Sequence, residues 1–365
     1  MKNCAGSVLR RVSLYFVLVV VLPGVSCRPG RPAVRKQSRL LMDTYVTIQA
    51  LGREQVVDSA IDVAFARLEG ISRKFNHLDT TSPVYAFNTR EVPLTDPEIV
   101  EVVRAAIDVS EASGGAFDIT VEPLVRLWGF YGDHPAVPEQ RQIDSCLKLT
   151  GYRNLVIEPG RVTKRNPETR IDLGGIAKGY ALREAARVLR AGGVQAAIID
   201  IGGDVFAIGS KGRERWRIGV RNPRSDSVLA VVAAEDLAAV TSGDYERFFW
   251  GPPRDTSQTG LGTRSDSSVE SVMSRVGHVP RDSVRYCHVV DPATGWPARG
   301  AASATVLMRD PLTAQGWSKV LFIRGRDALS LIEQAGGIEG LLVTDKQEVI
   351  RSAGWPGGAG DTGTR

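Results

Sequence analysis

Residues 171–180 read Ile-Asp-Leu-Gly-Gly-Ile-Ala-Lys-Gly-Tyr, a short apolar run that meets two glycines and continues with helical spacing. We predict a strand over 169–173 and a helix from about Ile176 to Arg190, ended by the glycines at 192–193. Such a junction exposes backbone N–H groups at the positive end of a helix dipole, which suits a pyrophosphate. The spacing matches neither G-x-G-x-x-G nor the P-loop, so an ordinary helix start is the alternative.

The segments on either side of this junction predict an α+β fold. Apolar residues repeat at four-three spacing over 57–71, as in an amphipathic helix. Thr95-Asp-Pro-Glu98 predicts a capping box that opens a second helix. Polar, glycine-rich breaks between later apolar runs favour hairpins, and therefore largely antiparallel sheets with packed helices. The remaining strands are expected at 41–51, 154–157, 196–201, 216–220, 230–234, 304–307 and 340–343, and a late helix at 312–323.

Four other segments could carry chemistry, and each has a structural alternative. Residues 113–120 place Asp118 among small residues just after a helix, which is also what a helix C-cap requires. Gly202-Gly203-Asp204 follows an apolar run and is typical of a tight turn. Residues 239–249 read Ala-Val-Thr-Ser-Gly-Asp-Tyr-Glu-Arg-Phe-Phe, which would also suit a strand end with surface ion pairs. His288 begins His-Val-Val-Asp-Pro-Ala-Thr-Gly-Trp-Pro, and a single histidine is often structural. No His/Cys cluster in the sequence predicts a zinc site.

The two ends of the chain are predicted to lie outside the folded domain. Basic residues precede the apolar run 14–22, which is too short to span a bilayer and is typical of a signal peptide. Small residues before Cys27 resemble a bacterial lipoprotein signal, with plain secretion as the alternative. We therefore predict a signal peptide over 1–26, lipid on Cys27, a basic tether over 27–40 and one domain over 41–356. A polar insertion is expected at about 252–283 and a disordered tail at 357–365.

Charge and cysteine content exclude several classes of protein. Lys plus Arg exceed Asp plus Glu by 46 − 41 = 5, and much of this excess lies near the N-terminus. No aromatic residues interleave with these charges, so they indicate contact with anionic headgroups and exclude a nucleic-acid site. Cys4 would leave with the signal and Cys27 would carry lipid, so Cys146 and Cys287 remain, and we expect both to be buried thiols.

Together, and in this order, the segments at 171–180, 239–249 and 288–297 resemble the ApbE family of FAD:protein FMN transferases. The resemblance covers nearly all of 40–355 apart from the insertion. It implies FAD bound with Mg²⁺ in a cleft between two lobes. It also implies transfer of FMN to a Thr or Ser hydroxyl of an acceptor protein, often a subunit of a membrane redox pump, with release of AMP. The expected location is the periplasmic face of the bacterial inner membrane, through a lipid anchor.

The resemblance also assigns residues. Asp172, Lys178 and His288 would be catalytic. FAD would contact Met42, Ala116, Phe117, Asp118, Asp172, Lys178, Thr241, Ser242, Gly243, His288 and Val289. A backbone oxygen at Gly175, together with the positions of Gln315 and Lys319, would face the metal.

Two departures from the family pattern bear on catalysis. Its metal-binding Asp and Thr are Gln315 and Lys319 here, and a protonated lysine cannot bind Mg²⁺. Lys319 could supply the positive charge itself, or the site could be degenerate and hold flavin without turnover. The aromatic residue common near Leu78 is absent, which could admit water. The alternatives to a transferase are therefore an FAD pyrophosphatase giving FMN and AMP, and a lipid-anchored flavin-binding protein.

Overall fold

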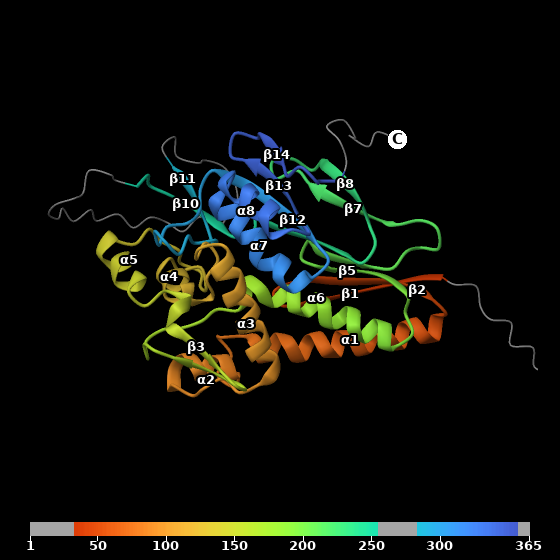
Figure 1. The fold of residues 1–365 in the computed structure, drawn as a ribbon, viewed down its shortest axis with the longest axis horizontal. Helices are drawn as coiled ribbons and strands as arrows, with labels where there is room; N and C mark the ends of the chain where they lie inside the picture. Colours follow the sequence, from red (N-terminus) through yellow and green to blue (C-terminus); the bar gives the residue numbers. More distant parts are fainter. Residues whose placement is uncertain (1–32, 255–282, 357–365) are drawn as a thin grey trace, which may run out of the picture.

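A computed structural model describes residues 33–254 and 283–356. Its centre is an eight-stranded sheet in which every neighbouring pair is antiparallel (Figure 1). In sheet order the strands are β1 (Ala33–Leu41), β2 (Thr44–Gly52), β5 (Ala196–Ile201), β6 (Asp204–Ile208), β9 (Leu237–Gly243), β12 (Ala301–Met308), β13 (Ile338–Thr344) and β14 (Val349–Arg351). The predicted α+β fold with antiparallel sheets is confirmed.

One face of this sheet is covered by helices. These are α1 (Glu54–Phe75), α3 (Pro97–Ala112), α6 (Gly174–Ala191), α7 (Pro311–Arg324) and α8 (Asp327–Ala335). Helix α6 lies between α1 and α7, and the same order is visible in Figure 1. Because side chains alternate along a strand, Ala238 and Val240 of β9 join the core beneath the helices.

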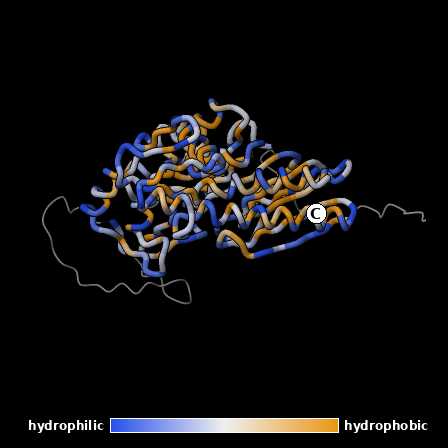
Figure 2. The backbone as a smooth tube through the Cα atoms, turned by 90° about the horizontal axis from the view of Figure 1, so that it is seen from below, coloured by the Kyte–Doolittle hydropathy of each residue, from blue (hydrophilic) through white to orange (hydrophobic). Residues whose placement is uncertain are grey.

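The other face packs against the hairpin of β7 (Trp216–Arg221) and β8 (Val228–Ala234). Here Leu237 and Ala239 of β9, one residue out of phase with the helix-facing set, meet Trp216. Figure 2 shows the hydrophobic stretches running through the middle of the molecule and many hydrophilic ones at its outline. Alternate side chains along these strands therefore point to opposite faces of the sheet, and each set packs in a different hydrophobic core.

A third cluster forms at one end of the molecule around the fully buried Trp128. It includes side chains of α4 (Glu122–Leu127), α5 (Gln140–Leu147), β10 (Phe248–Gly251) and β11 (Val284–Cys287). The remaining described elements are α2 (Pro83–Arg90), β3 (Leu155–Glu158), β4 (Arg161–Lys164) and the short 3-10 turns Ile119–Val121 and Tyr152–Asn154.

Four sequence predictions differ from the structure. Residues 169–173, predicted as a strand, lead into α6 without forming one, because the Ile171 N–H donates to the Asn88 side chain and not to a neighbouring strand. Most of the predicted tether is strand β1, because Arg35 pairs with Asp58 at 2.8 Å and Arg39 with Asp62 at 2.6 Å, both acids on α1. The cap of α3 is Asp96, not Thr95, since the Asp96 carboxylate accepts from the N–H groups of Glu98 and Ile99. The expected burial holds for the Cys287 thiol, whereas Cys146 is only partly buried.

Other predictions fall on residues that are not described. The signal peptide, Cys27, most of the 252–283 insertion and the 357–365 tail lie outside the described residues. Within 33–254 and 283–356, no helix is both long and apolar enough to cross a membrane.

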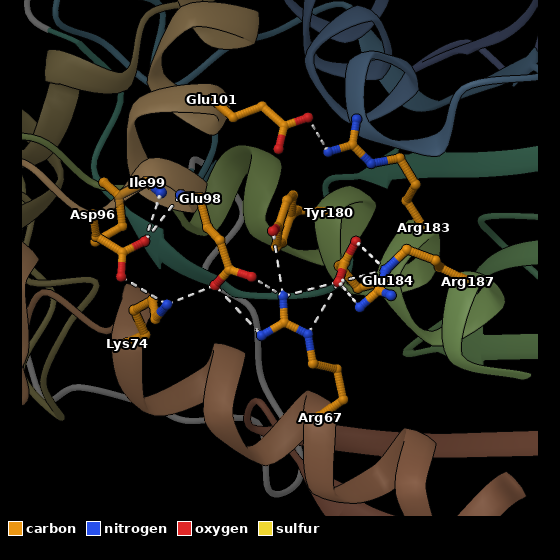
Figure 3. Close-up of polar contacts among 10 residues, drawn as sticks. All are labelled: Arg67, Lys74, Asp96, Glu98, Ile99, Glu101, Tyr180, Arg183, Glu184 and Arg187. Carbon is orange, nitrogen blue, oxygen red and sulfur yellow. Dashed lines mark hydrogen bonds and ion pairs between the residues drawn. The ribbon is translucent and has the colours of Figure 1, made fainter. Parts of the chain in front are cut away.

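A network of ion pairs joins α1, α3 and α6 (Figure 3). At its centre, Arg67 of α1 pairs with Glu98 of α3 and, at 2.9 Å, with Glu184 of α6. Glu98 also meets Lys74 at 2.6 Å. We call this set the three-helix network; its members are Arg67, Lys74, Asp96, Glu98, Glu101, Tyr180, Arg183, Glu184 and Arg187. It fixes the position of α6, the helix that begins at the glycine pair of 171–180.

Candidate functional site

A buried polar cluster lies where α6 and α7 cross the helix-covered face of the sheet. Its centre is Asp204 at the start of β6, with only 1% of its surface exposed. The Asp204 carboxylate pairs with Lys178 of α6 and accepts a 2.7 Å hydrogen bond from Gln315 Nε2 of α7. Its other oxygen accepts from the Thr241 backbone N–H at 3.0 Å. One carboxylate therefore binds two helices and a neighbouring strand.

Lys319 extends the cluster along α7. Its Nζ donates to Gln315 Oε1 at 2.7 Å, so the Gln315 amide relays a hydrogen bond from Lys319 to Asp204. The resulting order is Lys319–Gln315–Asp204–Lys178. We call these four residues, with Ser242 and Ser318, the site network.

The two lysines differ in electrostatic environment. Burial works to lower the pKa of Lys178, but the adjacent Asp204 carboxylate outweighs it and the pKa is raised. Burial lowers the pKa of Lys319 to about 8, and repulsion from Lys178 adds to this effect while Asp204 opposes it. Lys319 therefore remains largely an ammonium at neutral pH, and no carboxylate within 33–254 or 283–356 forms an ion pair with it.

Close helix packing holds these groups together. Gly179 of α6 faces α7, and a Cβ there would overlap the Pro311 carbonyl oxygen and lie 2.7 Å from Gln315 Cγ. The helices could not approach this closely with any larger residue. On the neighbouring turn, the Phe117 ring lies 3.2 Å from where a Cβ of Gly175 would be, and 3.3 Å from that of Gly316. The predicted flavin-site residue Phe117 is thus packed between both helices.

The structure separates two neighbouring predicted residues. Ser242 faces the helices and its hydroxyl lies 2.9 Å from that of Ser318 on α7. Thr241 faces the opposite core, where its hydroxyl meets that of Thr305 at 2.9 Å. Only the backbone N–H of Thr241 reaches the site network. Gly243, the last residue of β9, packs against the ring of Tyr245.

His288 follows β11 and is tied to the loop before β10. Its Nδ1 lies 3.2 Å from the Arg247 carbonyl oxygen; since a carbonyl only accepts, Nδ1 carries the hydrogen and Nε2 keeps a lone pair. Burial lowers the pKa of His288 to about 4, with further repulsion from Arg247, Lys319 and Lys178. His288 is therefore a neutral imidazole near both lysines.

Two further predicted residues lie close to this histidine. Val289 is buried next to His288. Met42 has a positive φ of 54° in the β1–β2 turn, and the following Asp43 lies 3.6 Å from the Arg247 guanidinium. The turn is thereby linked to the His288 segment.

Asp172 lies in a separate cluster at the start of α6. Its carboxylate accepts from the Gly174 N–H at 2.7 Å and from the Tyr131 hydroxyl at 2.7 Å, and it lies 3.4 Å from His77 Nδ1. Helix α6 does begin at the glycine pair. However, one of the amides predicted to bind pyrophosphate is occupied by this carboxylate.

The Asp118 carboxylate is bound by hydrogen-bond donors of the protein itself. Its carboxylate accepts from the Thr120 N–H and hydroxyl at 2.8 and 2.6 Å, and from the Tyr152 N–H at 2.6 Å. Burial raises its pKa, although these hydrogen bonds oppose the shift. Both oxygens thus bind the protein, and the neighbouring Ala116 is also buried. A flavin contact by these residues remains a prediction.

The side chains at the predicted metal positions do not suit Mg²⁺. Magnesium requires oxygen ligands, preferably carboxylates, but the Gln315 oxygen is bound by the Lys319 ammonium and Lys319 has no acceptor. No group of three or more His, Cys, Asp or Glu converges within the described residues. The side chains of Gln315 and Lys319 therefore do not offer Mg²⁺ suitable ligands, and the metal positions implied by the resemblance, including the backbone oxygen of Gly175, remain predictions.

Sequence reasoning missed the residue at the centre of the site. Gly202-Gly203-Asp204 was interpreted as a tight turn, and the turn is there, but Asp204 also starts β6 with its side chain among the helices. The signal that could have found it is the even register shared with Phe206 and Ile208. His77, Tyr131 and Ser318 were also missed, because their contacts are made between distant segments.

An open groove of about 560 Å³ lies elsewhere, between the start of α1 and the end of α6. Gln55, Arg187 and Gly192 line it, and it contains none of the predicted site residues. The expected FAD cleft between two lobes stays a prediction.

Comparison with known proteins gives consistent matches. A model of the ApbE family matches residues 42–342. An FAD:protein FMN transferase of Treponema pallidum is 27% identical over 366 residues, covering 93% of this chain and 92% of that protein. One of Vibrio cholerae is 30% identical, covering 74% of this chain and 71% of that protein.

Solved structures agree. The ApbE protein of Thermotoga maritima superposes with a TM-score of 0.74 at 31% identity, covering 88% of this chain and 97% of that one. The flavin transferase ApbE of Vibrio cholerae gives 0.71 at 26% identity, covering 88% and 98%.

Proposed function

This chain belongs to the ApbE family, and we propose that it is an FAD:protein FMN transferase that modifies a Thr or Ser hydroxyl of an acceptor protein. The observation that carries this function is the site network, in which two partly buried ammonium groups, Lys178 directly and Lys319 through Gln315, are held by the buried Asp204 carboxylate near a neutral histidine. Positive charge and a proton acceptor at one place are what diphosphate cleavage by a hydroxyl requires.

The reaction exchanges one phosphorus–oxygen bond for another. The acceptor hydroxyl oxygen bonds to the phosphorus attached to riboflavin, and the bond from that phosphorus to the bridging oxygen breaks. FMN is then a phosphoester on the acceptor, and AMP leaves with the bridging oxygen. Lys178 and Lys319 stabilise the negative charge that builds on the diphosphate oxygens.

His288 takes the proton of the attacking hydroxyl. Its Nδ1 hydrogen is directed at the Arg247 carbonyl, which leaves the Nε2 lone pair for the substrate. Its low pKa keeps that lone pair unprotonated at neutral pH. The proton passes afterwards to solvent.

The acceptor is a protein exposed on the outer side of the bacterial inner membrane, in the class of membrane redox-pump subunits. The basic and apolar segments before Cys27 support export and lipid attachment. Replacing Cys27 with Ala should move the protein from the membrane fraction to the soluble fraction. Retention of the variant in the membrane fraction would contradict the anchor.

The decisive experiment incubates the detergent-solubilised full chain with FAD and a Thr-containing acceptor protein. Covalent flavin fluorescence on the acceptor, with one AMP released for each flavin attached, would support the transferase. Free FMN with AMP would indicate a pyrophosphatase, and intact bound FAD a flavin-binding protein. The His288→Asn variant, which keeps a hydrogen-bond donor for Arg247, should bind FAD but transfer at least about a hundredfold more slowly.

A further inference from the structure

We propose that Lys178 and Lys319 together occupy the role of a divalent cation, so that this chain binds the FAD diphosphate through ammonium groups and works without Mg²⁺. The inference rests on the proposed function and concerns the same site. It follows from the disagreement between the side chains present and the ligands that a magnesium ion needs.

The first step is the placement of Lys319. Gln315 Nε2 is committed to Asp204 at 2.7 Å, which turns its Oε1 toward Lys319, also at 2.7 Å. A metal ion bound to this oxygen would have to displace the ammonium or lie beside a like charge. The only carboxylate in the site network, Asp204, is already bound to Lys178 and Gln315.

Contacts between α7 and its neighbours hold Lys319 in a fixed position. The Ser318 hydroxyl donates to the Gln315 carbonyl at 2.8 Å, so it must accept the hydrogen of Ser242 in their 2.9 Å contact. This bond fixes α7 against β9, and the Gly179 contact fixes α7 against α6. Lys319 is therefore held near Lys178 by packing that does not depend on a bound ion.

The site network carries a net positive charge. Two ammonium groups share one carboxylate, which leaves one positive charge within the site network. Farther away, Glu246 and Arg247 act on Lys178 with opposite signs, and the Asp200 carboxylate also interacts with Lys178 and offsets part of this charge. A partly buried charge without a direct carboxylate partner is unfavourable, and a diphosphate would reduce this cost by supplying an anion.

The test measures FAD binding by calorimetry on the detergent-solubilised full chain, in EDTA and in millimolar Mg²⁺. The wild-type Kd should differ by less than about threefold between the two buffers. Lys319→Met should weaken binding about tenfold or more in EDTA, as expected for a lost charged hydrogen bond. Lys319→Arg, which keeps the charge, should restore most of the affinity.

The matched control is Lys74→Met, which removes a half-buried lysine whose charge is already compensated by Asp96 and Glu98. It should leave the FAD Kd unchanged. The converse variant, Gln315→Asp with Lys319→Thr, should gain Mg²⁺ binding in a titration with the metal and FAD, and should lose FAD affinity in EDTA.

Three results would overturn the inference. FAD binding by the wild type that strengthens more than about threefold with Mg²⁺ would show that a metal is used, while leaving the transferase intact. Unchanged affinity in Lys319→Met would show that this ammonium does not meet the diphosphate. FAD uptake in neither buffer would overturn the inference and the proposed function together.

Discussion

The two charge clusters that α6 contributes to differ in how far carboxylates compensate their cations. In the three-helix network, each of the cations Arg67, Lys74, Arg183 and Arg187 meets at least one carboxylate in direct contact. In the site network, Lys178 and Lys319 have only Asp204 between them. The first cluster is matched charge for charge, and the second is left positive.

This difference separates stability from binding. Cations that are paired with carboxylates hold the helices together, and their charge is not available to an anionic ligand. An uncompensated cation near other buried groups works against folding, and its retention points to an anionic substrate. Four changes test this division, ordered by the size of the expected effect.

The largest effect is expected from Asp204→Asn. It removes the buried carboxylate that pairs with Lys178 and accepts from Gln315, and should lower the free energy of unfolding by about 3–5 kcal/mol in urea denaturation. Adding Lys319→Met to this variant should recover part of the loss, since one uncompensated cation is removed. A double variant no more stable than Asp204→Asn would contradict the charge imbalance.

Gly179→Ala should cost about 3 kcal/mol, because the new methyl group meets the Pro311 carbonyl and Gln315 across the helix contact. FAD affinity should fall as well, since Gln315 and Lys319 would be displaced. The control is Gly70→Ala in α1, where nothing lies within 4 Å of the new Cβ. That variant should be more stable than wild type by about 1 kcal/mol, from helix propensity.

Arg67→Met should reduce stability by about 2 kcal/mol, because the partly buried Glu98 and the buried Glu184 lose their shared partner. Calorimetry should give an FAD Kd equal to that of wild type. A large loss of affinity at unchanged fold would show that the two networks are coupled through α6, and the division drawn above would not hold.

The fourth test concerns a profile and not a single value, the pH dependence of stability. The pKa of folded His288 is about 4, below its ordinary 6.5, so the unfolded chain binds a proton first as pH falls. The contribution of the neutral imidazole is full above about pH 6.5 and declines toward pH 4. Denaturation of His288→Asn across this window should give a flatter profile than wild type; parallel profiles would contradict the shift.

The sequence predicted what depends on local patterns. The glycine pair at the start of α6, the antiparallel hairpins and the amphipathic α1 all follow from spacing within a short window. It failed where a distant partner decides the outcome. The basic run of β1 was interpreted as a tether because its acids, Asp58 and Asp62, lie on α1.

The site shows the same limit. Thr241 and Ser242 are adjacent in sequence and were assigned together, but strand alternation sends their hydroxyl groups to opposite faces of the sheet. The sequence predicted only a turn at Asp204, because its partners, Lys178 of α6 and Gln315 of α7, come from other parts of the chain.

Strand β1 also restricts how the protein could meet a membrane. It begins at Ala33, and Arg35 and Arg39 fasten it to α1. With lipid on Cys27, as proposed, the leash would comprise the six peptide units to Ala33, which reach at most about 20 Å when fully extended. A tether this short would hold the folded domain close to the bilayer. The acceptor sites should therefore lie close to the membrane surface, and not on domains that project far from it.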